Sequence, residues 1–133
     1  KGTPEKPGQV LVFVAGEWWL LTFPESLINR NDPIASLDVA LLQDRVLAPI
    51  LGIGDPRTDS RIAFVGGVRG CEELERRAGD QGVAFSMHAT SANELLAVAD
   101  ADEIMPPKST WFEPKLRSGL FVHEFERIQG AKA

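Results

Sequence analysis

The strongest constraint on the fold is a β-hairpin pattern near the start of the chain. Two runs rich in Val, Leu and aromatic residues, Gln9 to Val14 and Glu17 to Phe23, are separated only by Ala15 and Gly16. A two-residue connection that contains glycine is typical of a tight turn between antiparallel strands. Pro24 then ends the second strand, because proline has no amide hydrogen to donate to a neighbouring strand. The sequence therefore predicts an antiparallel pair of strands.

Two tryptophans, Trp18 and Trp19, follow one another in the second predicted strand. Successive side chains of a strand point to opposite faces of the sheet. We therefore expect one of them to lie in the core and the other to be available for an interface.

The middle of the chain alternates helical and extended patterns. From Ser36 to Leu51, apolar residues recur three or four positions apart, and Ser36 or Asp38 is placed to cap the first amides. The runs Arg61 to Val65 and Val83 to His88 are typical of short strands, with a predicted helix from Cys71 to Ala78 between them.

A third helix is expected to begin at Thr90 and Ser91. Ser91 with Glu94 three positions later forms a capping-box pattern, and the helix is expected to end at residues 100–102. Beyond it, Ser109 to Phe112 and Gly119 to Phe125 are predicted strands. The order ββαβαβαββ predicts an α+β (mixed α/β) fold, with a partly parallel sheet and helices packed on it.

The 133 residues, 44% of them hydrophobic and 25% charged, suit one globular domain, which we place at residues 9–126. Residues 1–8 carry two prolines and two glycines and have the composition of a linker, which suggests an upstream region, although an ordinary chain terminus has the same composition. Residues 127–133 are assigned as a tail. With one cysteine, Cys71, the core is not expected to depend on disulfides.

The charge of the chain restricts its partners. Nineteen acidic residues against 14 Lys and Arg give a net charge of −5, which is the wrong sign for binding a nucleic-acid backbone. The apolar runs are far shorter than the roughly 20 residues of a membrane-spanning helix. No signal peptide pattern is present, so we expect a cytoplasmic location with neither nucleic acid nor membrane as a partner.

Two patterns that resemble known sites fall short of them. The glycine-rich run Gly66 to Gly70 does not fit a dinucleotide-binding fingerprint, because Val65 stands where the first glycine belongs, and a tight strand-to-helix turn is the better interpretation. Asp100, Asp102 and Glu103 would suit magnesium, but acidic residues after a helix are usually solvated. The histidines and the cysteine have no zinc spacing, so no metal site is predicted.

The densest group of polar residues runs from Pro106 to Gly119. Three bases against one acid, Glu113, give this segment a charge of +2 and leave −7 for the rest of the chain. Basic side chains interleaved with hydroxyls are the donors that a phosphate or carboxylate requires, although a solvated basic hairpin tip would look the same. The candidate ligand-binding residues in this segment are Lys108, Ser109, Thr110, Lys115, Arg117 and Ser118.

His88 is a further candidate ligand-binding residue. It stands at the predicted carboxyl end of a strand and before a helix, where ligands of open sheets are often bound. The alternative is a histidine that only makes a local hydrogen bond. Strand order cannot be read from the sequence, so its proximity to Lys108 is an expectation from connection types.

One long segment gives the chain a family resemblance. The run Met105 to Lys115, continued by Ser118 to Leu120, resembles the domain-of-unknown-function family numbered 1015. The similarity extends upstream through Leu37 to Val39, Asp55 to Asp59, Ile62 to Gly67 and Phe85 to Ser91, and covers roughly residues 10–125. Longer members carry an upstream signature similar to that of partition-protein-B and sulfiredoxin-like nucleotide-binding domains, and this signature is absent here.

The resemblance implies a carboxy-terminal domain of a larger protein with an upstream domain as its partner. Such a domain would help to bind a small anionic metabolite or nucleotide phosphate, in a protein similar to nucleotide-dependent serine kinases that use a nucleotide with magnesium. No nucleophile and base pair stands out, so the chain is not expected to be catalytic by itself. The alternative is a docking domain without chemistry that packs on the upstream domain or on a second subunit, which leaves a homo-oligomer open.

Overall fold

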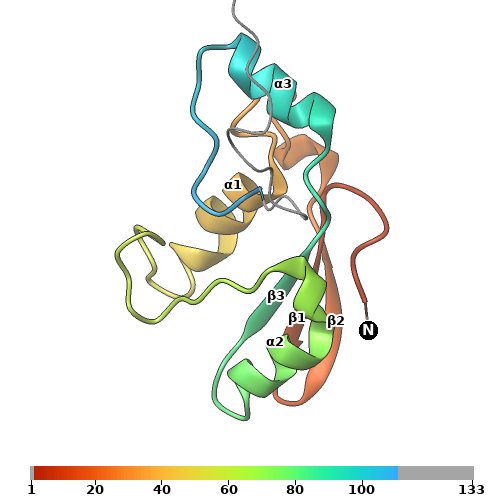
Figure 1. The fold of residues 1–133 in the computed structure, drawn as a ribbon, viewed down its shortest axis with the longest axis vertical. Coiled ribbons are helices and arrows are strands. Elements are labelled where there is room, and N and C mark those ends of the chain that lie inside the picture. The colour runs from red at the N-terminus through yellow and green to blue at the C-terminus, as the bar shows by residue number, and fades with distance from the viewer. Residues whose placement is uncertain (1, 111–133) are drawn as a thin grey trace, which may run out of the picture.

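The structure is a computed structural model that describes residues 2–110. It has a mixed α+β fold, in which α2 covers the small sheet and α1 and α3 lie beyond one end of that sheet (Figure 1). The strands are β1 (Gln9–Val14), β2 (Glu17–Thr22) and β3 (Ala84–Met87), and the α-helices are α1 (Asp38–Leu42), α2 (Gly70–Ala78) and α3 (Ala92–Asp100). Shorter turns of helix are η1 (Glu25–Leu27), the π-helix η2 (Gln43–Leu47) and η3 (Gly67–Arg69).

The sheet is antiparallel, in the order β2-β1-β3, so the prediction of a partly parallel sheet is wrong for the described strands. Val10 pairs with Leu21 on one side and with Met87 on the other. The helical connection from β2 to β3 joins two strands that run in the same direction. However, β1 lies between them, so each hydrogen-bonded neighbour is antiparallel.

The predicted hairpin is confirmed. Ala15 and Gly16 have φ angles of +51° and +79°, the two positive values typical of the type I′ turn in two-residue hairpins. The two tryptophans of β2 have different surroundings. The Trp18 ring lies 5.3 Å from that of Phe13, tilted by 49°, and its indole Nε1 donates a 2.7 Å hydrogen bond to Glu75 of α2. Trp19 is 59% exposed.

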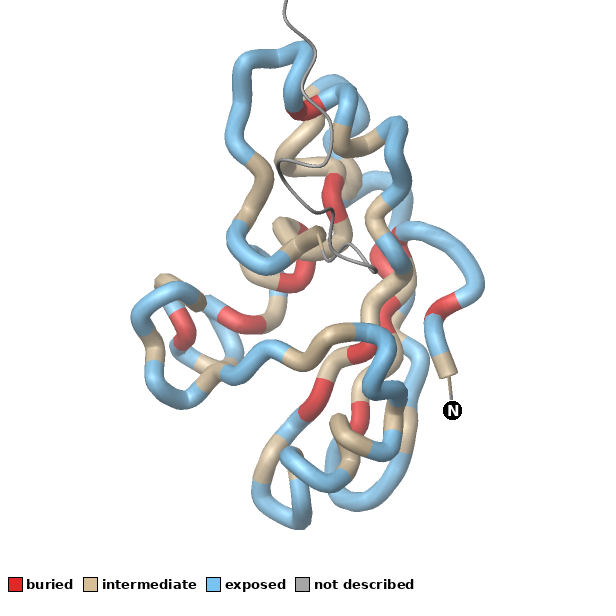
Figure 2. Tube along the Cα trace, in the orientation of Figure 1, coloured by how far each residue is buried: buried red, intermediate tan, exposed pale blue. Residues whose placement is uncertain are grey.

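The main core lies between the sheet and the α1–η2 segment. The buried segments of this region come from distant parts of the chain (Figure 2). Its buried side chains are Val10, Phe23, Leu41, Leu42, Leu47 and Ile53. Because Val10 occupies the middle strand and is fully buried, this core fixes the position of α1 relative to the end of the sheet.

The predicted single helix from Ser36 to Leu51 is wrong in its extent and in its cap. The α-helix begins at Asp38, after an N-cap residue, Leu37, that has no side-chain cap, and changes to a π-helix at Gln43. The wider turn is visible in the 2.9 Å bond from the Ala48 amide to the Gln43 carbonyl, five residues back. Asp38 does not cap α1, because its carboxylate accepts a hydrogen bond from the Gly8 amide instead.

The segment Arg61 to Val65 is not a strand, contrary to the prediction. Arg61 bonds to Asp59 and donates to the carbonyls of Leu51 and Gly52, which holds the start of this segment against the end of the preceding helical region. Those contacts keep it away from the sheet, so its strand-forming composition finds no neighbouring strand. The composition of Arg61 to Val65 does not reveal that the hydrogen bonds of Arg61 compete with strand pairing.

The predictions for α2, β3 and α3 are confirmed, within one or two residues at their ends. Residues 2–8 are attached to the domain, since the Gly2 carbonyl accepts bonds from Cys71 and Ser86 and the Gly8 carbonyl accepts one from Phe23. Ser109 and Thr110 are not in a strand. The rest of that predicted strand, the strand Gly119 to Phe125 and the tail 127–133 lie outside the described residues.

Candidate ligand-binding site at the end of strand β3

Three titratable residues from separate elements lie within electrostatic range of one another near the end of β3. Half-buried His88 directly follows β3, Asp38 is the first residue of α1, and Glu94 lies in the first turn of α3. The charges of both His88 and Glu94 act on the Asp38 carboxylate. We call this meeting point of Asp38, His88 and Glu94 the β3-end junction.

Asp38 is the most constrained member of the β3-end junction. Its Oδ1 accepts a 2.7 Å hydrogen bond from the Gly8 amide, which joins α1 to the segment that enters β1. Burial, the largest effect, raises the pKa of this carboxyl above 3.8; the Gly8 bond opposes the rise, Glu94 adds to it and His88 opposes it. The charged form of Asp38 is therefore less favourable in the folded protein than in the unfolded chain.

Replacing Asp38 with asparagine is expected to stabilise the protein at neutral pH. A carboxyl whose pKa is raised on folding stabilises the folded protein at low pH, and this contribution is lost as the pH increases from 3.8 through the folded pKa. Asparagine keeps an oxygen that can accept the Gly8 bond but carries no charge. Urea unfolding at about pH 7 should show Asp38→Asn to be more stable than the wild type, and the difference should disappear at about pH 3.

Asp44→Asn is the matched control for that comparison, because it removes an exposed carboxylate from η2. It should not reproduce the pH-dependent gain. A destabilised Asp38→Asn protein at neutral pH would show that the negative charge itself holds α1 in place, contrary to the burial argument.

The amino end of α3 is closed by its own side chains. The Ser91 hydroxyl accepts a 3.2 Å bond from the Glu94 amide, and the Glu94 carboxylate accepts a 2.7 Å bond from the Ser91 amide, which confirms the predicted capping box. The Glu94 carboxylate thus already places a negative charge at this helix end. This negative charge disfavours an anion at the amino end of α3.

The turn Pro106 to Ser109 packs against the loop that follows His88. The Ser109 amide donates a 3.3 Å bond to the Pro106 carbonyl, and Lys108 at the third position of the turn has a φ angle of +61°. A proline in second place and a positive φ in third place are typical of a type II turn. The Thr90 hydroxyl donates a 3.1 Å bond to the Ser109 carbonyl, which holds this turn against the loop that follows His88.

Four of the seven predicted site residues lie in the described part of the chain. Lys108 is exposed, whereas Ser109, Thr110 and His88 are half-buried. The Thr90 to Ser109 bond brings the turn and the segment after β3 together. Lys115, Arg117 and Ser118 lie outside the described residues.

Sequence reasoning did not identify three residues that shape this region: Asp38, Thr90 and Glu94 as neighbours of His88. Asp38 and Glu94 were interpreted only as helix-capping residues. α3 follows β3 closely in the sequence, whereas the position of Asp38 depends on α1 beginning near the end of β3, which is a tertiary feature. No local signal in the sequence carries that information.

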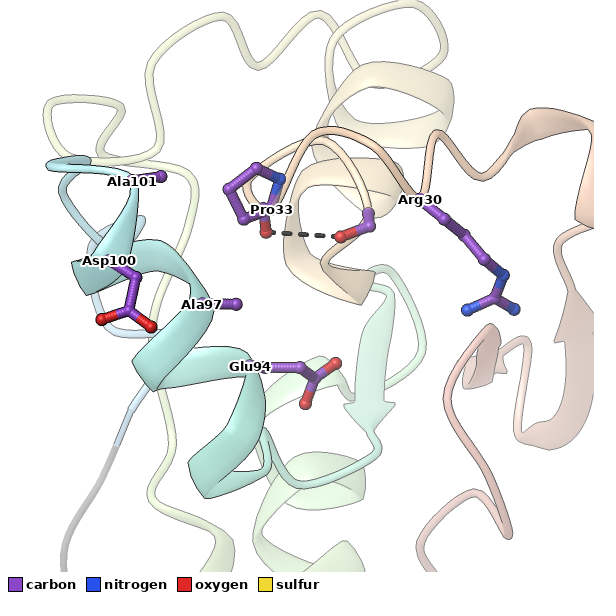
Figure 3. Close-up of a pocket in the computed structure, with 7 residues that line it drawn as sticks. Arg30, Pro33, Glu94, Ala97, Asp100 and Ala101 are labelled. Carbon is purple, nitrogen blue, oxygen red and sulfur yellow. Dashed lines mark hydrogen bonds between the residues drawn. The ribbon is translucent and has the colours of Figure 1, made fainter.

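A surface cavity lined in part by Glu94 is not suited to an anion. It has a volume of about 400 Å³ and lies between α3 and the segment before α1, with Glu94, Asp100 and Arg30 around it (Figure 3). The Arg30 guanidinium is paired with Glu25 at 2.7 Å. Glu94 and Asp100 therefore leave the cavity with a negative character.

Other patterns in the sequence do not form sites within residues 2–110. In that part of the chain no group of three or more His, Cys, Asp or Glu side chains could hold a metal ion. Asp102 and Glu103 are exposed after α3, and Gly67 to Arg69 form the short helical turn η3 that leads into α2. No helix in the described part is long and apolar enough to cross a membrane.

Comparisons of this chain with protein-family models, with curated proteins and with solved structures found no match. The family resemblance therefore remains a prediction from the sequence segments given above. The functional argument below depends on the geometry around His88 and Lys108.

Proposed function

We propose that this domain binds a small anion, a phosphate or carboxylate group, between the Lys108 turn and His88. The observation that carries the proposal is the φ angle of +61° at Lys108, in a turn that Thr90 holds beside the segment after β3. A side chain with a positive φ costs folding free energy that glycine would avoid. Strain of this kind is often retained at ligand sites.

The chemistry of the turn agrees with an anionic ligand. The Lys108 ammonium has three hydrogens to donate, and it forms no ion pair with any residue of the described chain. Thr110 adds a hydroxyl two positions later. Ser109 contributes little through its side chain, because its hydroxyl already donates a 2.6 Å bond to the Pro106 carbonyl.

The surrounding charges restrict where the ligand lies. Asp38 lies within electrostatic range of both Glu94 and His88, so we expect the ligand on the Lys108 side of that histidine, away from the two carboxylates. In a longer protein, an upstream domain would close the site from the solvent side. The family resemblance extends the proposal to a nucleotide phosphate with magnesium in a serine-type kinase, to which this chain would contribute only part of the site.

A thermal-shift titration tests the proposal. The wild-type chain is heated with inorganic phosphate, phosphoserine, ATP or CTP, with and without magnesium. A ligand that binds only the folded protein adds about 2.7 kcal/mol at 100 times its dissociation constant, so the melting temperature should rise. No rise with any of these anions, or an equal rise in Lys108→Ala, would contradict the proposal; Lys6→Ala serves as a control that removes another exposed lysine.

A docking domain without chemistry is the second candidate function. It is favoured by large apolar side chains on the surface, including Trp19 at 59% and Leu20 at 56% exposure on β2. Under this function, Lys108→Ala would change thermal stability or oligomer size and leave the response to phosphate unchanged.

A further inference from the structure

The outer edge of β2 is unpaired within the described chain. β2 is an end strand of the order β2-β1-β3, and β1 is its only strand neighbour among residues 2–110 (Figure 1). The Phe23 amide donates to the Gly8 carbonyl at 2.8 Å, which extends the hairpin ladder by one hydrogen-bonded pair. Main-chain groups alternate in direction along a strand, so those of Trp18, Leu20 and Thr22 point away from β1 and can pair with a further strand.

The side chains on this edge are apolar on both faces of the sheet. Trp19 lies opposite Val12 and is 59% exposed, whereas Leu20 lies opposite Leu11 and is 56% exposed. The four central residues of β2, Trp18 to Leu21, carry no charge. Edge strands are normally protected from pairing by charged residues, proline or a bulge, and in β2 the only such residue is Glu17 at its first position.

We propose that β2 pairs with β2 of a second copy of this chain, antiparallel and about a twofold axis, to form a continuous six-stranded sheet. A strand that covers this edge must be apolar on both of its faces and uncharged at its centre. β2 itself meets both requirements. The other edge strand, β3, does not fit as well, because it has four residues and none of them is exposed.

The free main-chain groups restrict the pairing to registers in which outward-pointing residues face one another. Among these, the register that overlaps the two strands completely from Glu17 to Phe23 places Leu20 opposite Leu20 of the second copy, and Trp18 opposite Thr22 of the second copy. Glu17 then falls opposite Phe23, so the two Glu17 carboxylates stay at opposite ends of the contact. The closed pairing uses both β2 edges and leaves no edge for open polymerisation.

The first test is the molar mass of the full chain in solution, measured by light scattering across a wide range of protein concentration. The wild type should reach the mass of two chains. Leu20→Lys should remain a monomer, because two lysines would face each other at the axis. Leu96→Lys is the matched control, since Leu96 is 58% exposed on α3, and it should dimerise as the wild type does.

The second test measures the register by disulfide cross-linking in a Cys71→Ser background. Hydrogen-bonded antiparallel pairs have a Cα separation near 5.5 Å, which a disulfide can bridge. Leu20→Cys should form a covalent dimer on mild oxidation, and Leu96→Cys should not. A wild type that stays monomeric, a dimer that survives Leu20→Lys, or a dimer that Leu20→Cys fails to cross-link would overturn the proposal.

Discussion

Replacement of Leu41 with alanine is expected to lower the free energy of unfolding by about 2 to 5 kcal/mol. Leu41 is 4% exposed and belongs to the cluster between α1 and the sheet. Truncation of the side chain removes apolar contacts and leaves a cavity that the neighbouring side chains fill only in part. Because small domains are stable by about 5 to 15 kcal/mol, this single change should remove a large share of the total.

Urea unfolding followed by circular dichroism measures the loss from Leu41→Ala. Leu96→Ala makes the same change on α3 at a position that is 58% exposed, and it should alter stability by less than about 0.5 kcal/mol. Equal effects of the two substitutions would show that α1 does not pack on the sheet as described. That result would also remove the support for Asp38 beside His88, because the same packing positions α1.

Replacement of Lys108 is expected to separate stability from ligand binding. Glycine adopts a φ of +61° readily, whereas alanine keeps the strain, so Lys108→Gly should be more stable than Lys108→Ala by about 1 kcal/mol. Both variants lack the ammonium group, and both should bind phosphate at least tenfold more weakly, which corresponds to about 1.4 kcal/mol.

Lys108→Arg provides the control for charge, because it keeps the positive side chain and the strain and should retain most of the affinity. Thermal unfolding and isothermal titration with phosphate give the two quantities separately. Equal stability of the glycine and alanine variants would contradict the strain argument. Retained affinity in Lys108→Gly would exclude Lys108 as a ligand for the anion.

Local features of the fold could be predicted from the sequence, because their causes are local. The turn at Ala15 and Gly16, the capping box of Ser91 and Glu94, and the helix from Gly70 to Ala78 all depend on residues a few positions apart. The structure places them where the pattern predicted. The separation of Trp18 from Trp19 also follows from strand alternation alone.

Features that depend on distant contacts could not be predicted. The sheet is antiparallel because β1 lies between β2 and β3. The α-helix after Ser36 is shorter than predicted because it changes to a π-helix at Gln43. Arg61 bonds to carbonyls of the preceding segment, so a strand-like sequence stays outside the sheet.

In the candidate site, too, only the features with local causes could be predicted. The sequence indicates His88 as a candidate because it follows a predicted strand. It indicates Lys108 because of the basic segment around it. The position of the Lys108 turn beside the segment after His88 depends on the bond between Thr90 and Ser109, which joins residues 19 positions apart. The position of the Asp38 carboxylate depends on its hydrogen bond with the Gly8 amide, 30 positions away.

Nuclear magnetic resonance titration of the nitrogen-15-labelled chain with inorganic phosphate tests the central claim most directly. The amide signals of His88, Lys108, Ser109 and Thr110 should shift together and give one dissociation constant, while those of Ala97 and Asp100 at the acidic cavity should remain in place. Shifts confined to the cavity residues, or no shifts at saturating phosphate, would contradict an anion site between Lys108 and His88.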